Sequence, residues 1–333
     1  MQNRKIHFIR NYIYVSIVVI GALIIILMAV IIPGVLPDTK DSAETTHSEP
    51  TPPSEHTIDS TDTNFGVITL PEPPFEPPEP IEISLPPIID TGALDNFLSP
   101  YTDRYAVYYE NLETGFVYEM NADWILPAAS VIKAPYVLYV YTLAEAGLAD
   151  LSSEHIYKSG DYKDGSGKIK DMPYGSVFTE YELLQYAIRN SDNIAQTMLV
   201  RKYGTNEFRE FAESLGANPA LITTVAGANM TAFEASIYAK AIYDYIESDS
   251  VYGETLKTDL MNTRNIMIVS DYPVARKYGW WGVAFHDMAI VYADSPYILV
   301  IFSDTGENIN FTPFANISRR FQEFNDNEFH NEF

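Results

Sequence analysis

The sequence predicts an α/β domain of the α+β type, in which an antiparallel five-stranded sheet is flanked by helices and joined to an all-helical subdomain. Three observations support this prediction. Two strand-like segments open the globular part of the chain, a block of capped helical segments follows, and three strand-like segments with a last helix close it. Strands separated by a run of helices favour an antiparallel sheet with helices packed on it.

The first elements follow the usual patterns of strand, turn and helix. Residues 105–109 and 115–119 are predicted strands around a turn at 110–114. A helix is expected to begin at Ser130, because serine is a favoured N-cap and an apolar run follows it. This helix should end near Glu145, before the stop signal of a glycine.

The middle of the chain is predicted to be helical. Residues 159–176 contain several glycines and lysines and are expected to form a loop. Two capping boxes, Thr179-x-x-Glu182 and Thr231-x-x-Glu234, then open helices. The expected helices span residues 180–188, 194–203, 205–215 and 232–246, with Gly204 and Gly216 ending the second and third.

The last part of the chain should complete the sheet. Three segments have the composition of strands, at residues 274–281, 287–293 and 297–303. A helix over residues 313–324 is expected to close the domain.

The sequence of the N-terminal region indicates a membrane-anchored protein. Residues 1–10 carry three basic residues and no acid. Residues 11–36 carry no charge, and residues 13–32 are almost wholly apolar, which is long enough to span a bilayer. A basic flank stays in the cytoplasm, so the rest of the chain is expected outside. A cleaved signal peptide is the alternative interpretation. The predicted organisation is a cytoplasmic N-terminus (1–10), a single-pass anchor (11–36), a Pro-rich acidic disordered stalk (37–88) and a globular domain (89–333).

Composition argues against several classes of function. The formal charge of −24 disfavours nucleic-acid partners, because phosphate contacts need clusters of lysine and arginine. The chain has no cysteine, which removes disulfides, thiolate metal sites and cysteine nucleophiles. The six histidines are scattered without paired ligand spacing, so no metal site and no cofactor is predicted.

The first candidate catalytic motif is Ser130-x-x-Lys133. Residues three apart on a helix share a face, and a lysine buried in an apolar core loses hydration, so its pKa should fall until it can accept a proton. A serine needs such a neighbouring base to become a nucleophile. The alternative for this motif alone is a capped core helix whose lysine extends to water.

Two further motifs lie downstream. Ser191-Asp192-Asn193 falls at a predicted helix junction, where an Asp or Asn is ordinarily a cap. Lys277-Tyr278-Gly279 falls on a predicted strand, where lysine is ordinarily a solvated edge residue. In a functional interpretation, the glycine lets a substrate backbone approach the strand and the lysine offers a charge to an anionic group.

Together, in this order, the three motifs resemble those of the class A β-lactamases and the penicillin-binding proteins. The resemblance extends from about Asp95 to Phe324 and implies a β-lactamase/DD-peptidase-like fold. It also implies that Ser130 attacks a carbonyl and forms an acyl-enzyme, that Lys133 is the candidate base, and that Ser191 passes the proton to the leaving nitrogen.

The resemblance assigns the remaining site residues to substrate binding. Asn193 would hold the side-chain amide of the substrate, and Lys277 would attract its carboxylate, with Tyr278 and Gly279 completing the third motif. The oxyanion hole would be formed by the backbone N–H groups of Ser130 and Trp280.

The chain departs from the family pattern in two places. The β-lactamases carry a Glu-x-x-Leu-Asn loop whose glutamate activates the deacylating water, whereas residues 215–231 contain no acid here. Glu234 is better explained as the capping partner of Thr231. The third motif usually has Thr or Ser where this chain has Tyr278. His286 borders the same region and is expected to be structural.

Three hypotheses follow for function. The first is an active extracytoplasmic serine hydrolase, whose substrate is a β-lactam or a D-Ala-D-Ala-like cell-wall peptide. The absent glutamate favours a penicillin-binding peptidase over an efficient β-lactamase. The second is a non-catalytic cell-wall-binding module that retains the fold, and the third is a stalked surface adhesin.

Overall fold

A five-stranded antiparallel sheet lies at the centre of the computed structural model, which describes residues 89–305 and 310–329. The order of its strands is β2-β1-β9-β8-β7, so the predicted sheet is confirmed. The bounds of the strands are β1 Tyr105–Asn111, β2 Val117–Met120, β7 Val274–Trp281, β8 Ala284–Val291 and β9 Tyr297–Asp304.

The sheet joins the two ends of the domain. β1 pairs with β9 over its whole length, from Tyr105 opposite Ser303 to Asn111 opposite Tyr297. β7 pairs only with β8 and therefore forms an edge of the sheet. An edge strand leaves one row of backbone groups without a partner in the sheet.

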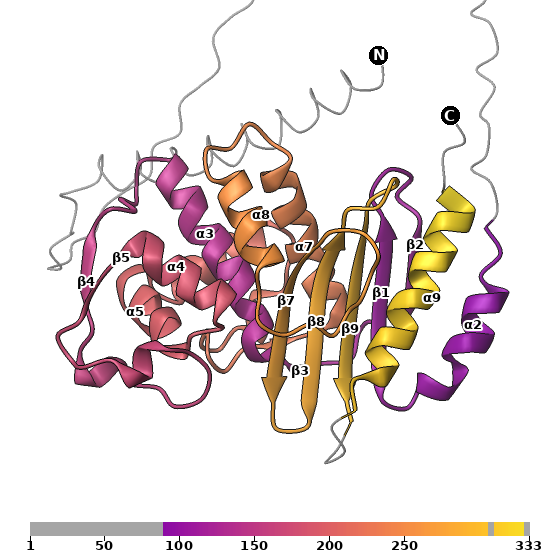
Figure 1. Cartoon of the computed structure of the whole chain (residues 1–333), viewed down its shortest axis with the longest axis horizontal. Coiled ribbons are helices and arrows are strands. Elements are labelled where there is room, and N and C mark those ends of the chain that lie inside the picture. Colours follow the sequence, from indigo (N-terminus) through magenta and orange to yellow (C-terminus); the bar gives the residue numbers. More distant parts are fainter. Residues whose placement is uncertain (1–88, 306–309, 330–333) are drawn as a thin grey trace, which may run out of the picture. The chain divides into compact units, whose positions relative to one another are not determined.

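Helices cover both faces of the sheet (Figure 1). The helices α2 and α9 lie on one face, and the helical block from α3 to α8 lies on the other. Their bounds are α2 Gly92–Leu98, α3 Lys133–Glu145, α4 Glu180–Arg189, α5 Asn193–Tyr203, α6 Asn206–Ser214, α7 Ala232–Ile246, α8 Gly253–Met261 and α9 Thr312–Phe329.

The alternation of side chains along β1 separates two hydrophobic cores. Ala106 and Tyr108 belong to the core shared with the helical block. Tyr105, Val107 and Tyr109 belong to the core shared with the phenylalanines of α9. Successive residues of a strand point to opposite faces, so a sheet covered on both sides buries both sets. This explains why β1 is apolar at nearly every position.

The first capping box is present as predicted. The Thr179 hydroxyl accepts a hydrogen bond from the Glu182 backbone N–H at 3.2 Å, and the Glu182 carboxylate accepts one from the Thr179 backbone N–H at 2.7 Å. In the second box, Thr231 accepts from the Glu234 backbone N–H at 2.9 Å. The Glu234 carboxylate, however, accepts from the backbone N–H of Asn218 instead of closing the box.

Several elements differ from the sequence-based predictions, among them α2 and the short strands β3 to β6, none of which was predicted. Ser130 does not cap a helix: it lies within a 3₁₀ turn, Ala129–Ile132, and α3 begins only at Lys133. The second of the last three strands spans Ala284–Val291 instead of residues 287–293. The helix α8 was not predicted, because its sequence carries no capping residue and little amphipathic pattern.

Two short antiparallel strand pairs lie outside the main sheet. β3 (Leu126–Pro127) pairs with β6 (Asn229–Met230), just before the segment of Ser130. β4 (Glu154–Ile156) pairs with β5 (Val177–Thr179) beside the helical block.

Across residues 89–305 and 310–329, none of the helices combines the length and the apolar character needed to cross a membrane. The predicted cytoplasmic N-terminus, anchor and stalk (1–10, 11–36 and 37–88) lie outside the described residues.

Candidate active site

The nucleophile candidate, Ser130, lies at the junction between the sheet and the helical block. The residue before it, Ala129, has a φ of 49°, in the left-handed region that a side chain with a Cβ rarely adopts. This turn directs the chain from β3 into the 3₁₀ segment and then into α3. Among the described residues, the Ser130 hydroxyl forms no hydrogen bond with another side chain or with the backbone.

A buried histidine fixes the segment that leads to Ser130. His286 is fully buried on β8, and its Nε2 lies 2.9 Å from the carbonyl oxygen of Pro127. Its Nδ1 accepts from the backbone N–H of Ser303 at 3.3 Å, so the Nε2 proton is the one donated to Pro127. Burial lowers the pKa of His286 to about 4, which keeps the ring neutral. His286 therefore has the structural role that the sequence favours.

Lys133 is buried one turn after Ser130 and faces the second motif. Its ammonium donates to the Ser191 carbonyl oxygen at 2.5 Å and to Oδ1 of Asn193 at 2.7 Å, and it lies 3.4 Å from the Ser191 hydroxyl. Burial lowers the pKa of Lys133 to about 7, although the charge of Asp192 opposes the decrease. At neutral pH a large fraction of Lys133 is therefore deprotonated and able to accept a proton.

The hydroxyl of Ser191 lies within hydrogen-bond distance of two buried lysines. Lys277 on β7 donates to the Ser191 hydroxyl at 3.0 Å, and Lys133 lies 3.4 Å from the same hydroxyl. Burial lowers the pKa of Lys277 well below its ordinary value, and the nearby charge of Lys133 lowers it further. Ser191 itself has a φ of 51°, so its backbone is held in the left-handed region. A hydroxyl between two amines that bind protons weakly is placed to relay a proton.

Asp192 holds the turn in place through its carboxylate. One of its carboxylate oxygens accepts from the backbone N–H groups of Ile194 and Ala195, which caps α5. The other accepts from the N–H groups of Lys168 and Ile169 in the neighbouring loop. All of its accepting capacity is directed to the backbone, so the cap interpretation of Asp192 is correct.

Asn193 connects Lys133 to the wall of the site. Its oxygen accepts from Lys133, and its amide nitrogen donates to the carbonyl of Asp164 at 2.8 Å. Gly165, in the left-handed region with a φ of 98°, packs directly against that amide, where a Cβ would lie 2.9 Å from the nitrogen. The loop from residue 164 to 168 thus lies against the second motif.

Gly279 allows β7 to approach the nucleophile. A Cβ at this position would lie 3.1 Å from the backbone nitrogen of Ser130, and equally close to Ala128 O and Ala129 Cβ. The residue after it, Trp280, belongs to the same edge strand. The backbone nitrogens assigned to the oxyanion hole therefore come from two segments in direct contact.

Tyr278 covers Lys277. The ammonium of Lys277 lies 4.2 Å from the centroid of the Tyr278 ring, and only 5% of Tyr278 is exposed. Burial raises the pKa of the Tyr278 hydroxyl, whereas a hydrogen bond with Ser191 and the charge of Arg264 lower it. Arg264, on the loop before β7, is a neighbour of the site that no motif in the sequence indicated.

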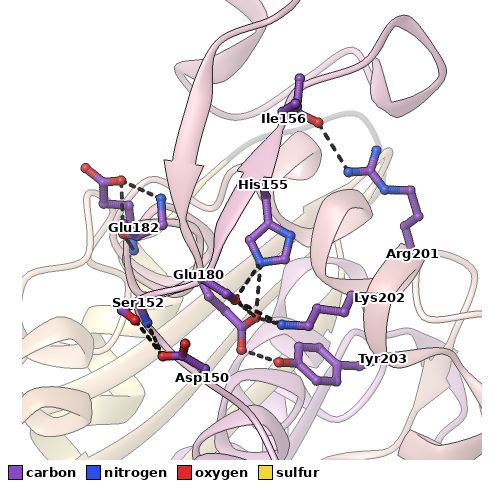
Figure 2. A network of polar contacts seen from close by, with 11 residues as sticks. Asp150, Ser152, His155, Ile156, Glu180, Glu182, Arg201, Lys202 and Tyr203 are labelled. Atoms are coloured by element: carbon purple, nitrogen blue, oxygen red, sulfur yellow. Dashed lines mark hydrogen bonds and ion pairs between the residues drawn. The ribbon is translucent and has the colours of Figure 1, made fainter.

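A second polar network ties together the far ends of α4 and α5 (Figure 2). The carboxylate of Glu180, fully buried at the start of α4, accepts from His155 at 3.1 Å, and from Lys202 and Tyr203 at the end of α5. The turn at Ser191 lies at the opposite end of this helix pair. Sequence analysis did not identify these residues, because they come from three distant segments and form no local motif.

Glu234 lies away from the nucleophile. Its carboxylate accepts from the backbone N–H of Asn218 at 2.9 Å, and burial raises its pKa. It lines a pocket of about 470 Å³ together with Glu119, Asn121 and Phe233, and none of the three motifs contributes to that pocket. The structure therefore gives Glu234 no role beside Ser130.

The fold and the three converging motifs define a serine hydrolase type of site, and comparisons with known proteins agree. Residues 91–323 match the model of the β-lactamase enzyme family. The chain therefore belongs to this family. No curated protein matches the chain.

Several solved structures share the fold. A β-lactamase from Sphaerobacter thermophilus is 18% identical with a TM-score of 0.64, covering 71% of this chain and 97% of that one. PBP-A is 17% identical with a TM-score of 0.65, covering 74% of this chain and 99% of the other. A mutant of PBP-A, 16% identical with a TM-score of 0.63 over 72% of this chain and 100% of its own, was solved as an acyl-enzyme complex with penicillin G.

Proposed function

We propose that this protein is a serine acyl-transfer enzyme in which Ser130 forms an acyl-enzyme with β-lactams or with D-Ala-D-Ala-type cell-wall peptides. The observation that carries the proposal is the position of Lys133. It is a buried amine one turn from Ser130, hydrogen-bonded to the second motif, with a pKa of about 7. A non-catalytic binding module has no need to bury a lysine in this way, because burial of an amine costs free energy.

In the proposed acylation step, Lys133 accepts the proton of Ser130 as its oxygen attacks the substrate carbonyl. The negative charge on the carbonyl oxygen is stabilised by the backbone N–H groups of Ser130 and Trp280. Ser191 transfers a proton to the leaving nitrogen, and it recovers one from the adjacent Lys133 or Lys277. The carbonyl C–N bond breaks as the carbonyl carbon is esterified to Ser130: the amine of a peptide departs with its proton, whereas the protonated amine of a β-lactam stays attached to the acyl group.

Deacylation is proposed to be slow. Hydrolysis of an ester intermediate needs a base that activates water, and residues 215–231 supply no acid. Of the acids described above, Asp192 is fully engaged by four backbone N–H groups, and Glu234 faces a different pocket. The protein should therefore behave as a penicillin-binding peptidase and not as an efficient β-lactamase.

The site is further proposed to act outside the cell, with the chain anchored by residues 11–36. The support is the uncharged apolar segment behind a basic flank. Protease treatment of intact cells that express the full chain tests this. Loss of the catalytic domain from intact cells supports the proposal, and full protection contradicts it.

The test of the reaction is intact-mass spectrometry of the purified protein over several hours. The probes are a penicillin, its methyl ester and a thioester of an acylated amino acid, and Ser130→Ala is the control. A lasting adduct on the wild-type protein, absent from the variant, is expected with at least one probe. Rapid consumption of the β-lactam without an adduct would instead indicate a β-lactamase. Absence of any adduct or turnover would leave the binding module as the better hypothesis.

A further inference from the structure

The turn between β7 and β8 presents an uncharged, exposed apolar surface. Trp281 is 68% exposed and Trp280 54%, and Val283 on the same turn is 40% exposed. Residues 278–285 contain no charged side chain, although the chain as a whole has a formal charge of −24. Tryptophan is buried on average in folded proteins, so two adjacent exposed tryptophans indicate a surface that contacts another molecule.

The two tryptophans point to opposite faces of the sheet, and one of them has a structural role. Trp280 is paired with Phe285 across the hairpin, and the two rings stack with 5.3 Å between their centroids. Its Nε1 donates to the carbonyl oxygen of Gly282 at 3.0 Å, within the tight turn. Phe285 in turn belongs to the core shared with α9. The indole of Trp280 therefore fixes the turn that carries Trp281.

Trp281 lies on the face of β7 that contacts the nucleophile. The pairing of β7 with β8 is continuous up to Trp281, so side chains alternate without a break and Trp281 shares a face with Gly279. Gly279 packs against the backbone of Ser130, and two residues of a strand span about 7 Å. Among the described residues, the Trp281 ring forms no hydrogen bond and no contact with another aromatic ring. Its exposed indole is therefore open to a ligand held at Ser130.

The direction of a bound substrate follows from the order of groups along β7. In the proposed acylation, the substrate carbonyl oxygen lies between the backbone N–H groups of Ser130 and Trp280. The leaving nitrogen receives its proton from Ser191, whose hydroxyl is bonded to Lys277, before Trp280 on the strand. The two substituents of a carbonyl carbon point away from each other. A leaving group on the Ser191 side therefore directs the acyl group toward Trp281 and the turn.

We propose that Trp281 determines the acyl specificity of this site: its indole stacks on a planar or bulky apolar group in the acyl part of the substrate, so substrates that carry such a group are preferred. This inference rests on the proposed acyl transfer by Ser130. Stacking removes apolar surface of both partners from water and adds the preference of aromatic rings for one another. The rigid turn holds the indole in place before the substrate arrives, which reduces the entropy lost on binding.

The test compares benzylpenicillin with 6-acetamidopenicillanic acid, which lacks only the phenyl ring of the acyl side chain. The measured quantity is the second-order rate constant of acylation, followed by intact-mass spectrometry. The wild-type protein should react at least about tenfold faster with benzylpenicillin, because only this probe brings a ring to the indole. Thioesters of N-phenylacetylglycine and N-acetylglycine repeat the comparison without a β-lactam ring.

Three variants separate stacking from other effects. Trp281→Ala should lower the preference for the phenylacetyl probes by at least about fivefold, while its rate with the acetyl probes stays within about twofold of wild type. Trp281→Phe keeps an aromatic ring and should retain a preference within about threefold of wild type. Val251→Ala is the control, since it truncates a 79% exposed apolar side chain that precedes α8. Acylation by the acetyl probes shows that each variant is folded and retains its nucleophile.

Four results would overturn the proposal, and three of them leave the acyl transfer itself intact. These three are equal wild-type rates with the phenylacetyl and acetyl probes, an unchanged preference in Trp281→Ala, and a proportional loss with both probes in that variant. The last of these would mean that Trp281 only supports the strand. The fourth is a wild-type protein that reacts with none of the four probes, which would refute the proposed function and this inference with it.

Discussion

The backbone nitrogen of Ser130 lies 3.1 Å from the position that a Cβ on Gly279 would occupy. The nucleophile and the edge strand are therefore in direct contact, and their relative position is set by the absence of a side chain. Two backbone atoms and the Ala129 methyl group surround that position, so none of the neighbours is the flexible end of a long side chain.

The first prediction concerns this contact. Gly279→Ala should displace the turn at Ser130 by a few tenths of an ångström and misalign the oxyanion donors. We expect the rate of acylation to fall by roughly 10²-fold, in the range observed when one oxyanion donor is lost. Gly160→Ala is the control, since a Cβ there meets no atom within 4 Å. Equal acylation rates in the two variants would show that the contact does not position the nucleophile.

The second prediction concerns the pH dependence of acylation. If Lys133 is the base, only its neutral form reacts, and its pKa is about 7. The acylation rate should therefore rise with pH to about 7 and level off above it. Lys133→Met should lower the rate by roughly 10²–10⁴-fold and remove this pH limb. Stopped acylation assays with mass detection between pH 5 and 9 measure both effects. A profile that falls with rising pH would exclude Lys133 as the base.

The third prediction concerns stability. Lys133 and Lys277 have pKa values below their unfolded values, so the unfolded chain binds more protons between about pH 7 and pH 10. The free energy of unfolding should therefore increase with pH in this window, by at most about 1.4 kcal/mol per pH unit for each lysine. Urea unfolding at pH 7, 8 and 9 measures the slope, and Lys133→Met should reduce it. An identical slope in the two proteins would contradict the assignment.

The fourth prediction concerns the network in Figure 2. Glu180→Gln removes the charge that His155, Lys202 and Tyr203 share, and it should destabilise the fold by about 2 kcal/mol. The partial exposure of Lys202 keeps the effect below that of a fully buried pair. Thermal unfolding should show a Tm lower by about 4–8 °C.

The exposed Glu213 on α6 provides the control for this experiment. Glu213→Gln should leave the Tm within about 1 °C of the wild-type value. A Glu180→Gln protein as stable as this control would mean that the network adds nothing to the stability of the helix pair.

Local signals in the sequence were sufficient for much of the fold. The Thr179 capping box, the stop at Gly204 and the strand at residues 274–281 were all predicted, because each depends on residues close together in the chain. The helix α8 was missed, since burial by its neighbours and not its own pattern holds it in place. The 3₁₀ turn at Ser130 was missed for a similar reason: contact with β7 determines it.

For the site, too, some features could be predicted from the sequence and others could not. The motifs predicted candidate site residues, and the structure brings Lys133 and Lys277 within hydrogen-bond distance of the Ser191 hydroxyl. The sequence did not show that Tyr278 lies over Lys277, because the direction of a side chain at a sheet edge depends on its surroundings. Nor did it reveal Arg264, which reaches this region from a loop without regular structure.

Ala129, next to Ser130, and Ser191, beside Lys133, both have left-handed backbones although neither is a glycine. Each such residue costs roughly 1–2 kcal/mol relative to a relaxed conformation. Glycine would relieve the strain at both positions, yet at Ser191 it would also remove the hydroxyl that accepts a hydrogen bond from the buried Lys277. Backbone strain and a buried hydrogen bond therefore oppose each other at Ser191, so selection for thermal stability alone would favour glycine at Ala129 and would keep the serine at Ser191.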